Sequence, residues 1–212
     1  MPTSIPVWSD PEFLRAHDSV KGVSHLDGYR LFQLWDLISK APEGGSLIEV
    51  GVWRGGSAAV IARQAQRRHP GATVYLCDTF TGLPNVNQHL DPCLKGGQGA
   101  DTSAAMVRDL MVRMDLTNIK IVPGIFPGSF TDRIESLSFA HIDVDVYRSC
   151  RETFEWIWPK LLPGGILVFD DYGYPETPGI TLCINEIVEE RKSELLWVPI
   201  QPMQAVLFKI TP

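Results

Sequence analysis

Short apolar runs alternate with helix-periodic segments through most of the chain. The apolar runs predict buried strands at residues 46–51, 72–77, 118–122, 138–143 and 165–170. The periodic segments predict helices at residues 57–69, 101–115, 149–161 and 179–191, the second with Asp101 or Thr102 as its N-cap. This alternation indicates βαβ units and a parallel sheet, and the nearly continuous apolar strands indicate helices on both of its faces.

Two further strands, near residues 195–199 and 203–209, follow one another through the short link IQPMQ. So short a connection predicts an antiparallel hairpin at the end of the sheet. Two helical patterns, at about 10–18 and 26–40, precede the first strand. Seven mostly parallel strands with a terminal hairpin, in an α/β order, are typical of the Rossmann-like fold of class I methyltransferases.

The length of 212 residues fits one α/β domain. We expect a helical cap at residues 1–44 and a core at residues 45–212, the cap covering the active site, packing on the sheet edge or forming a dimer contact. The formal net charge of −6 and the lack of a Lys/Arg stripe argue against nucleic-acid binding. No apolar run approaches the ~20 residues that span a bilayer. We therefore expect neither a nucleic acid nor a membrane as partner.

The cysteines and the N-terminal residues bear on the compartment. The four cysteines show no CxxC spacing, which favours reduced thiols over a disulfide framework or a zinc site. The first residues, MPTSIPVWSDPEF, have neither a basic nor an apolar region of the kind found in signal peptides. Together these features predict a cytoplasmic protein.

A long aperiodic stretch, PNVNQHLDPCLKGGQGA at residues 84–100, follows the second predicted strand. A loop of this length in a compact domain is usually functional or disordered. It would rise from the carboxyl edge of the sheet, where ligands bind in open α/β folds. We interpret it as a substrate-side lid, with a surface insertion as the alternative.

A glycine-rich turn follows the first predicted strand. Gly51, Gly55 and Gly56 lie between that strand and a helix, so they permit a tight turn and a close approach of a ligand to the backbone. The spacing GxxxGG differs from the GxGxxG of dinucleotide dehydrogenases. Glu49 precedes the turn, and Asp78 ends the next strand, where an acid can accept the hydroxyls of a ribose. The turn is therefore a candidate cofactor site.

Aspartates follow the next two strand ends at the same edge of the predicted sheet. Asp143 and Asp145 end one strand, and Asp170 and Asp171 end the next. Both members of the second pair can face one ion only if Asp171 already lies in a turn. Carboxylates this close would repel unless a cation neutralised them, and Mg²⁺ prefers such oxygen ligands. We predict Asp143, Asp170 and Asp171 as metal ligands; Asp145 could instead cap the helix that begins near Tyr147.

A bound divalent ion would make an acceptor hydroxyl more acidic and prepare it for attack on a methyl group. A nearby residue must then take the proton. Asp143 is one candidate, as a ligand with a free oxygen. His89 in the lid is another and is favoured over His25, while His141 lies deeper in its strand and is interpreted as a core histidine.

These segments resemble the macrocin O-methyltransferase family, metal-dependent enzymes of antibiotic biosynthesis that methylate sugar hydroxyls. The resemblance covers about residues 47–191 and rests on the segments IEVGVWRGGS, CDTFTGLP, IVPGIFPGSF, HIDVDVYRSC and LLPGGILVFDDYG, followed by a PGI…INEI helix. It implies S-adenosylmethionine as cofactor, Mg²⁺ or a similar divalent cation, a small-molecule hydroxylated acceptor and a homo-oligomer. The cofactor contacts it implies are Glu49, Gly51, Gly55, Ser57, Asp78, Gly124, Asp143, Asp145 and Tyr147.

Three alternatives remain at this point. The first is an NAD-dependent oxidoreductase on a related fold, against which the turn spacing and the Asp170–Asp171 pair argue. The second is a related metal-dependent enzyme of the cephalosporin-hydroxylase type, or methyl transfer to a nitrogen. The third is a binding module without catalysis, which would leave three clustered carboxylates unexplained. The acceptor is open, although a vicinal diol would suit a chelating ion.

Overall fold

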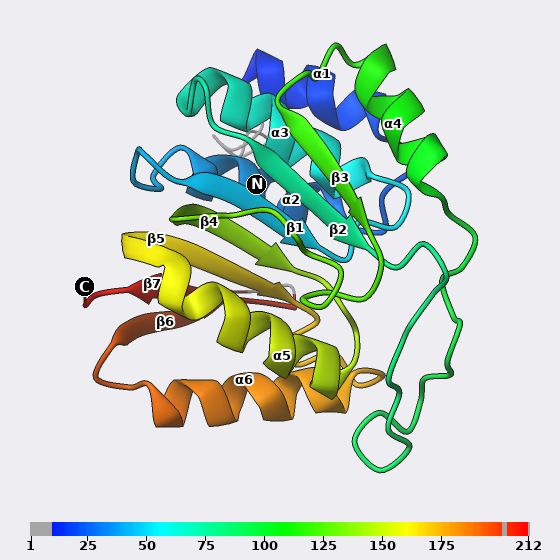
Figure 1. Ribbon diagram of the computed structural model, residues 1–212, viewed down its shortest axis with the longest axis vertical. Helices are drawn as coiled ribbons and strands as arrows, with labels where there is room; N and C mark the ends of the chain where they lie inside the picture. Colours follow the sequence, from blue (N-terminus) through cyan, green and yellow to red (C-terminus); the bar gives the residue numbers. More distant parts are fainter. Residues whose placement is uncertain (1–9, 201–202, 212) are drawn as a thin grey trace, which may run out of the picture.

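A seven-stranded sheet organises the protein in the computed structural model, which describes residues 10–200 and 203–211 (Figure 1). The strand order is β3-β2-β1-β4-β5-β7-β6. The first five strands of this order are mutually parallel, and β7 pairs antiparallel with both β5 and β6. The bounds are β1 Ser46–Val50, β2 Val74–Asp78, β3 Ile119–Pro123, β4 Leu137–Ile142, β5 Leu161–Asp170, β6 Leu195–Ile200 and β7 Gln204–Lys209. The predicted fold class and terminal hairpin are confirmed.

Helices cover both faces of the sheet (Figure 1). They are α1 Pro11–Ser19, α2 Gly28–Ile38, α3 Gly56–Arg68, α4 Ala104–Arg113, α5 Tyr147–Ile157 and α6 Pro178–Glu190, with a short 3₁₀ turn, η2 Trp158–Lys160, after α5. The predicted ranges agree except at their ends. The N-cap of α4 is Ser103, whose side chain accepts the Met106 N–H, instead of the predicted Asp101 or Thr102.

Alternate side chains of the central strands enter two separate cores, as the pleat of a strand requires. Leu47 and Phe139 pack with the helices α1 to α4. Ile48 and Ala140 point to the opposite face and pack with α5 and α6. Both faces of β1 and β4 are therefore buried, which explains why their sequences read as continuous apolar runs.

The N-terminal cap lies over a face of the sheet, not at its edge. Asp10 and Asp27 cap α1 and α2 by accepting backbone N–H groups of the first turn. Phe13 and Leu34 are fully buried in the same core as Leu47 of β1. The cap is thus part of the fold's main core; its first nine residues lie outside the described part of the chain.

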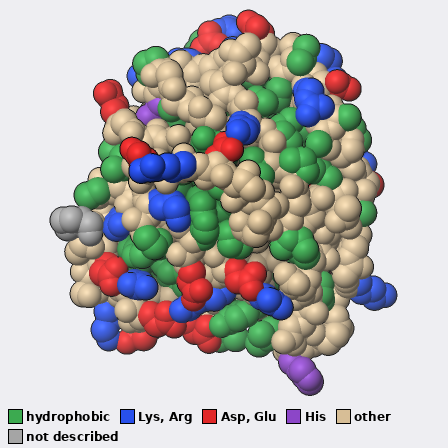
Figure 2. All heavy atoms as spheres, in the orientation of Figure 1, with side chains coloured by type: hydrophobic (Ala, Val, Ile, Leu, Met, Phe, Trp, Pro, Cys, Tyr) green, Lys and Arg blue, Asp and Glu red, His purple; other side chains and the backbone are tan. Residues whose placement is uncertain are grey.

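Acidic and basic side chains alternate over the outer surface of α5 and α6 (Figure 2). Arg151 of α5 pairs with Glu155 on its own helix and with Glu190 on α6. The surface seen in this view therefore mixes both signs of charge. All four cysteines are unpaired, as expected. Among the described residues, no helix has the length and apolar character needed to cross a membrane.

The end of β1 and the segment after β4 lie in contact through their backbones. Gly51 has a left-handed φ of 93°, and a Cβ at this position would overlap the carbonyl oxygen of Asp143. The Asp143 N–H in turn donates to the Val50 carbonyl oxygen at 2.9 Å. The absence of a side chain at Gly51 therefore fixes how closely these two strand ends approach.

Gly51→Ala should lower the free energy of unfolding by about 2 kcal/mol more than Gly71→Ala, measured by denaturant unfolding. Both glycines have a left-handed φ, 93° and 86°, but no atom lies within 4 Å of a Cβ at Gly71. Gly71 thus controls for backbone strain alone. Equal losses in the two variants would contradict the close approach of the strand ends.

Candidate active site

A cavity of about 580 Å³ lies at the carboxyl ends of the parallel strands. Ligands bind at this edge in open α/β folds, in the crevice outside the strand ends. Residues that follow β1 to β5 form its floor, while the segment before α2 and the lid complete its wall. The wall includes Ser24, His25, Arg30, Gly51, Ser57, Asp78, Leu83, Leu94, Gln98, Gly124, Asp143, Asp145, Asp170 and Asp171.

The glycine-rich turn forms one end of the cavity and is held by Asp78. Gly51 and Gly55 both have left-handed φ values, and α3 begins directly after Gly55. The Asp78 carboxylate accepts the backbone N–H groups of Val52 and Trp53 at 2.7 and 2.8 Å. Asp78 therefore shapes the turn in addition to lining the cavity.

The structure divides the predicted cofactor residues into two groups. Those in the cavity wall are Gly51, Ser57, Asp78, Gly124, Asp143 and Asp145. Glu49, Gly55 and Tyr147 lie outside the wall. A Cβ on Gly55 would touch Val107 of α4, so this glycine serves helix packing. The Tyr147 hydroxyl donates to Glu186 of α6 at 2.6 Å and ties two helices together.

Glu49 is fully buried behind the turn. Its carboxylate forms a hydrogen bond to Nδ1 of His141 at 2.8 Å, and neither side chain is exposed. The two residues are register partners on β1 and β4, so their side chains share one face of the sheet. This arrangement agrees with the interpretation of His141 as a core histidine and places Glu49 within the sheet instead of in the cavity wall.

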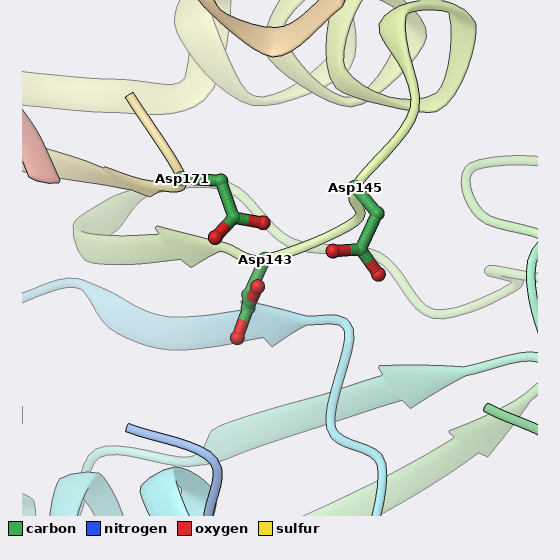
Figure 3. A group of neighbouring side chains, drawn as sticks. All are labelled: Asp143, Asp145 and Asp171. Atoms are coloured by element: carbon green, nitrogen blue, oxygen red, sulfur yellow. The ribbon is translucent and has the colours of Figure 1, made fainter. Parts of the chain in front are cut away.

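Three carboxylates converge beyond the ends of β4 and β5 (Figure 3). One oxygen each of Asp143, Asp145 and Asp171 lies within 4.8 Å of the others. Asp145 and Asp171 have left-handed φ values of 60° and 66°. Asp171 therefore lies in a turn, the condition under which it can face the same space as Asp143. The N-cap of α5 is Val146, so Asp145 joins the carboxylates instead of capping that helix.

Asp170 borders this group but points to a cation. Its Oδ2 accepts from Nη1 of Arg30 on α2 at 2.6 Å, and both side chains are largely buried. Arg30 also donates from Nε to Asp27 and from Nη2 to the carbonyl oxygen of His25. The other oxygen of Asp170 is buried without a partner among the described residues. The structure thus groups Asp145, and not Asp170, with Asp143 and Asp171, one oxygen of each lying within 4.8 Å of the others.

Burial and mutual repulsion disfavour the charged forms of these carboxyl groups. Burial, and then the charge of Asp170, raise the pKa of Asp143 well above its ordinary value. Burial and the charge of Asp171 do the same to the pKa of Asp145. Burial raises the pKa of Asp170 to about 6, although His141 and Arg30 lower it. A cation bound here would relieve this repulsion.

The two histidines considered as bases have different positions. His25 lies in the cavity wall, with its ring 3.8 Å from the Trp53 ring between centroids. His89 is exposed, and its side chain lies outside the wall formed by the described residues. The preference for His89 over His25 therefore finds no support in this geometry. The sequence offers no periodic signal in the irregular lid that would have separated them.

Two hydroxyls that the sequence reading did not single out also face the cavity. Ser149 and Thr153 on α5 are 7 % and 1 % exposed, and their hydroxyl oxygens have no partner among the described residues. They are spaced i, i+4 on a helix face that is otherwise apolar, which is the signal that could have identified them. Buried polar groups without partners suit a cavity that receives a polar ligand.

The chain is similar in sequence to a known protein family and to individual enzymes. The family described as macrocin-O-methyltransferase (TylF) matches residues 22–203. A demethyldecarbamoylnovobiocin O-methyltransferase of Streptomyces niveus is 31 % identical over 60 % of this chain and 53 % of its own length. A tetracenomycin rhamnosyl 4'-O-methyltransferase of Streptomyces olivaceus is 32 % identical over 74 % of this chain and 63 % of its own. The chain thus spans less than two thirds of these two relatives.

Solved structures share the fold. The O-methyltransferase NovP superposes with a TM-score of 0.77 at 22 % identity, over 89 % of this chain and 83 % of its own. The calicheamicin methyltransferase CalS11 gives a TM-score of 0.65 at 19 % identity, over 93 % and 91 % of the two chains. With the seven-stranded sheet and the match over residues 22–203, these findings show that the chain belongs to the macrocin O-methyltransferase (TylF) family.

Proposed function

We propose that this protein is an S-adenosylmethionine-dependent, Mg²⁺-dependent O-methyltransferase that acts on a hydroxyl of a small-molecule acceptor. The observation that carries the proposal is the convergence of Asp143, Asp145 and Asp171 in the same cavity as the glycine-rich turn. A turn of this kind alone suits any nucleotide-like ligand. The adjoining carboxylates add a site for a hard cation next to it.

The cavity offers groups that fit the cofactor. The turn from Gly51 leaves the backbone open to close approach, and α3 begins at its end. Asp78 and the unpartnered hydroxyls of Ser149 and Thr153 supply polar groups in the same wall. When bound, S-adenosylmethionine supplies a methyl group on a positively charged sulfur. The protein's part is to hold that methyl group in line with the acceptor oxygen.

The carboxylates fit a divalent cation. Ligand oxygens about 2.1 Å from Mg²⁺ are about 3–4 Å from one another, in keeping with carboxylate oxygens that lie within 4.8 Å. Asp143 and Asp171 would hold the ion, with the third protein oxygen from Asp145 as it stands or from the unpartnered Oδ1 of Asp170. The ion would supply a positive charge that favours loss of the acceptor proton.

The remaining steps fall to this chain's own groups. A carboxylate oxygen of Asp143 accepts the proton of the acceptor hydroxyl. Bound at the turn from Gly51, S-adenosylmethionine would supply the methyl carbon to the acceptor oxygen, and the electron pair of the broken carbon–sulfur bond would stay on sulfur. Asp143 would take this proton on the carboxylate oxygen that does not bind the ion. The lid residues Leu94 and Gln98, which line the cavity, would help to keep water from the reacting groups.

A sugar or natural-product hydroxyl is the proposed acceptor. Among the relatives, the names specify O-methylation of novobiocin, tetracenomycin and mycinamicin compounds, one of them at a rhamnosyl group. A vicinal diol would suit two adjacent positions on one ion.

We also propose that the protein forms a homo-oligomer. Light scattering after gel filtration would test this, and a monomer would contradict it.

S-Adenosylhomocysteine should raise the melting temperature of the protein, whereas NAD should not. A ligand present at a hundred times its Kd stabilises the folded state by about 2.7 kcal/mol, which for a chain of this size is a shift of roughly 5–10 °C. Thermal-shift titrations with the two compounds make the comparison. Stabilisation by NAD alone would favour the oxidoreductase alternative instead.

Removing the cation or one of its ligands should abolish methyl transfer while the fold stays intact. We expect Asp143→Asn and Asp171→Asn, or excess EDTA on the unchanged protein, to lower turnover at least a hundredfold. Conversion of S-adenosylmethionine is measured with catechol and methyl α-L-rhamnoside as acceptors. Asp109→Asn, an exposed aspartate on α4, is the matched control.

Two further variants assign the third ligand. A loss of Mg²⁺-dependent turnover in Asp145→Asn but not in Asp170→Asn would identify Asp145 as the third ligand, and the reverse would identify Asp170. Full turnover of Asp143→Asn in EDTA would contradict the metal-dependent reaction altogether.

In EDTA, the part of the free energy of unfolding that Asp143 and Asp170 contribute should fall as the pH rises from about 4 through about 6. The folded protein keeps Asp143 and Asp170 protonated to higher pH than the unfolded chain does, so it binds more protons in this window. Asp143→Asn should reduce the fall in the free energy of unfolding between pH 5 and pH 7.5 by about 1 kcal/mol or more. Replacing EDTA with Mg²⁺ should have the same effect on the wild type. Denaturant unfolding at both pH values measures this. Identical slopes for the wild type and Asp143→Asn would be incompatible with carboxylate repulsion.

A further inference from the structure

The lid has a defined structure of its own. At its base the Leu83 N–H donates to the Gln98 carbonyl oxygen at 2.9 Å, and the Gly97 N–H donates to the Leu83 carbonyl oxygen at 3.1 Å. Further along, the Gln88 side chain donates to the Leu94 carbonyl oxygen at 3.0 Å. These contacts form a closed loop that carries Leu94 and Gln98 in the cavity wall. The lid also runs past the N-terminal ends of α5 and α6 (Figure 1).

One buried carboxylate attaches the lid to the core of the protein. Asp91 is fully buried. Its Oδ1 accepts the backbone N–H of Tyr147, the first residue of α5, at 3.0 Å, and its Oδ2 accepts the Asn87 N–H at 3.1 Å. The N-cap residue of α5, Val146, has a side chain that cannot accept such a bond. The lid therefore supplies the cap that the helix's own sequence lacks.

The first turn of α6 leaves space for the Asp91 carboxylate. Gly179 is the second residue of α6, and a Cβ there would overlap Oδ1 of Asp91 and lie 2.9 Å from the Leu90 carbonyl oxygen. Its φ lies outside the left-handed region, so its own backbone does not require glycine. The space it leaves is occupied by the lid. The Asp91 carboxylate thus sits at the N-terminal ends of two helices, where their dipoles favour a negative charge.

The far end of the lid is attached to the cofactor end of the cavity. Asp101 accepts from Nε1 of Trp53 at 2.8 Å and from Nη2 of Arg54 at 2.6 Å, and both donors lie in the glycine-rich turn. This contact is exposed, whereas the one at Asp91 is buried. The stretch between the two attachments contributes Leu94 and Gln98 to the cavity wall.

We propose that Asp91 is a positioning residue that fixes the lid against α5 and α6, so that Leu94 and Gln98 form a ready-made wall for the acceptor. The inference rests on the proposed methyl transfer for the role of that wall. It assigns acceptor selection to the lid and not to the carboxylates, which only require a hydroxyl. Asp91 itself does not line the cavity.

Hydrogen exchange read by mass spectrometry tests the attachment. Asp91→Ala and Gly179→Ala break the same contact from its two sides, and each should speed exchange of lid peptides at least tenfold while peptides of β1 and β4 stay unchanged. In Asp91→Asn, the exchange rate of the lid peptides should lie between the rates of these two variants and that of the wild type, because the amide oxygen can still accept the Tyr147 N–H. Cys93→Ser, an exposed position in the lid, is the control and should match the wild type. Unchanged lid exchange in Asp91→Ala, or equal acceleration over the whole chain, would overturn the proposal.

Binding and turnover separate this inference from the proposed function. Asp91→Ala should bind S-adenosylhomocysteine within threefold of the wild type in calorimetry, since the glycine-rich turn is untouched. With the acceptors named above, it should raise the acceptor KM at least tenfold and change kcat less than threefold. The opposite split, with kcat lost and the acceptor KM kept, would contradict a positioning role. Failure of the wild type to bind S-adenosylhomocysteine would instead refute the methyltransferase function and leave the exchange result to decide on Asp91.

Discussion

Repulsion among carboxylates at the ends of β4 and β5 is the constraint on which the site depends. Two unit charges about 4 Å apart interact by about 4 kcal/mol at an effective dielectric constant of about 20, which is large beside a total stability of about 5–15 kcal/mol. The fold nevertheless holds Asp145 and Asp171 in left-handed backbone conformations next to Asp143. Such conformations are uncommon outside glycine and gather at functional sites. The arrangement is understandable if a cation completes it.

The surrounding elements each contribute one part of this edge. Arg30 of the N-terminal cap neutralises Asp170, so one of the four aspartates already has a buried cation. Gly51 lets the turn after β1 come against the backbone of Asp143, and this brings the glycine-rich turn next to the carboxylates. Asp91 attaches the lid to the first residue of α5. Residues far apart in sequence thus define one cavity, with the glycine-rich turn at one end and the carboxylates and the lid residues in its wall.

The order of strands and helices, and several residues of the cavity, could be predicted from the sequence because they depend on patterns among neighbouring residues. The strand and helix order follows from hydrophobic periodicity, and the carboxyl ends of parallel strands must share an edge, which brought Asp78, Asp143 and Asp171 to one cavity. The lid was found because seventeen residues at positions 84–100 lack periodicity. None of these inferences needed a contact between distant side chains.

The parts that could not be predicted depend on side-chain direction and distant partners. Nothing in the sequence shows that Arg30 reaches Asp170, a carboxylate 140 residues away, or that Asp145 groups with Asp143 and Asp171. Glu49 looked like a cofactor ligand because it adjoins the glycine-rich turn. The pleat instead directs it to His141 within the sheet. From the sequence, Gly179 was only a residue near the start of a helix. The structure shows that a side chain at this position would overlap Asp91 of the lid.

The most direct test of a cation-dependent methyltransferase site is a crystal structure with S-adenosylhomocysteine and Mn²⁺, in which anomalous scattering locates the ion. The account predicts the nucleoside at the glycine-rich turn beside Asp78 and one anomalous peak about 2.2 Å from oxygens of Asp143 and Asp171. It also predicts open positions on the ion that face Leu94 and Gln98. A nucleoside bound at the turn with no peak among these aspartates, or a peak at another place on the protein, would contradict it.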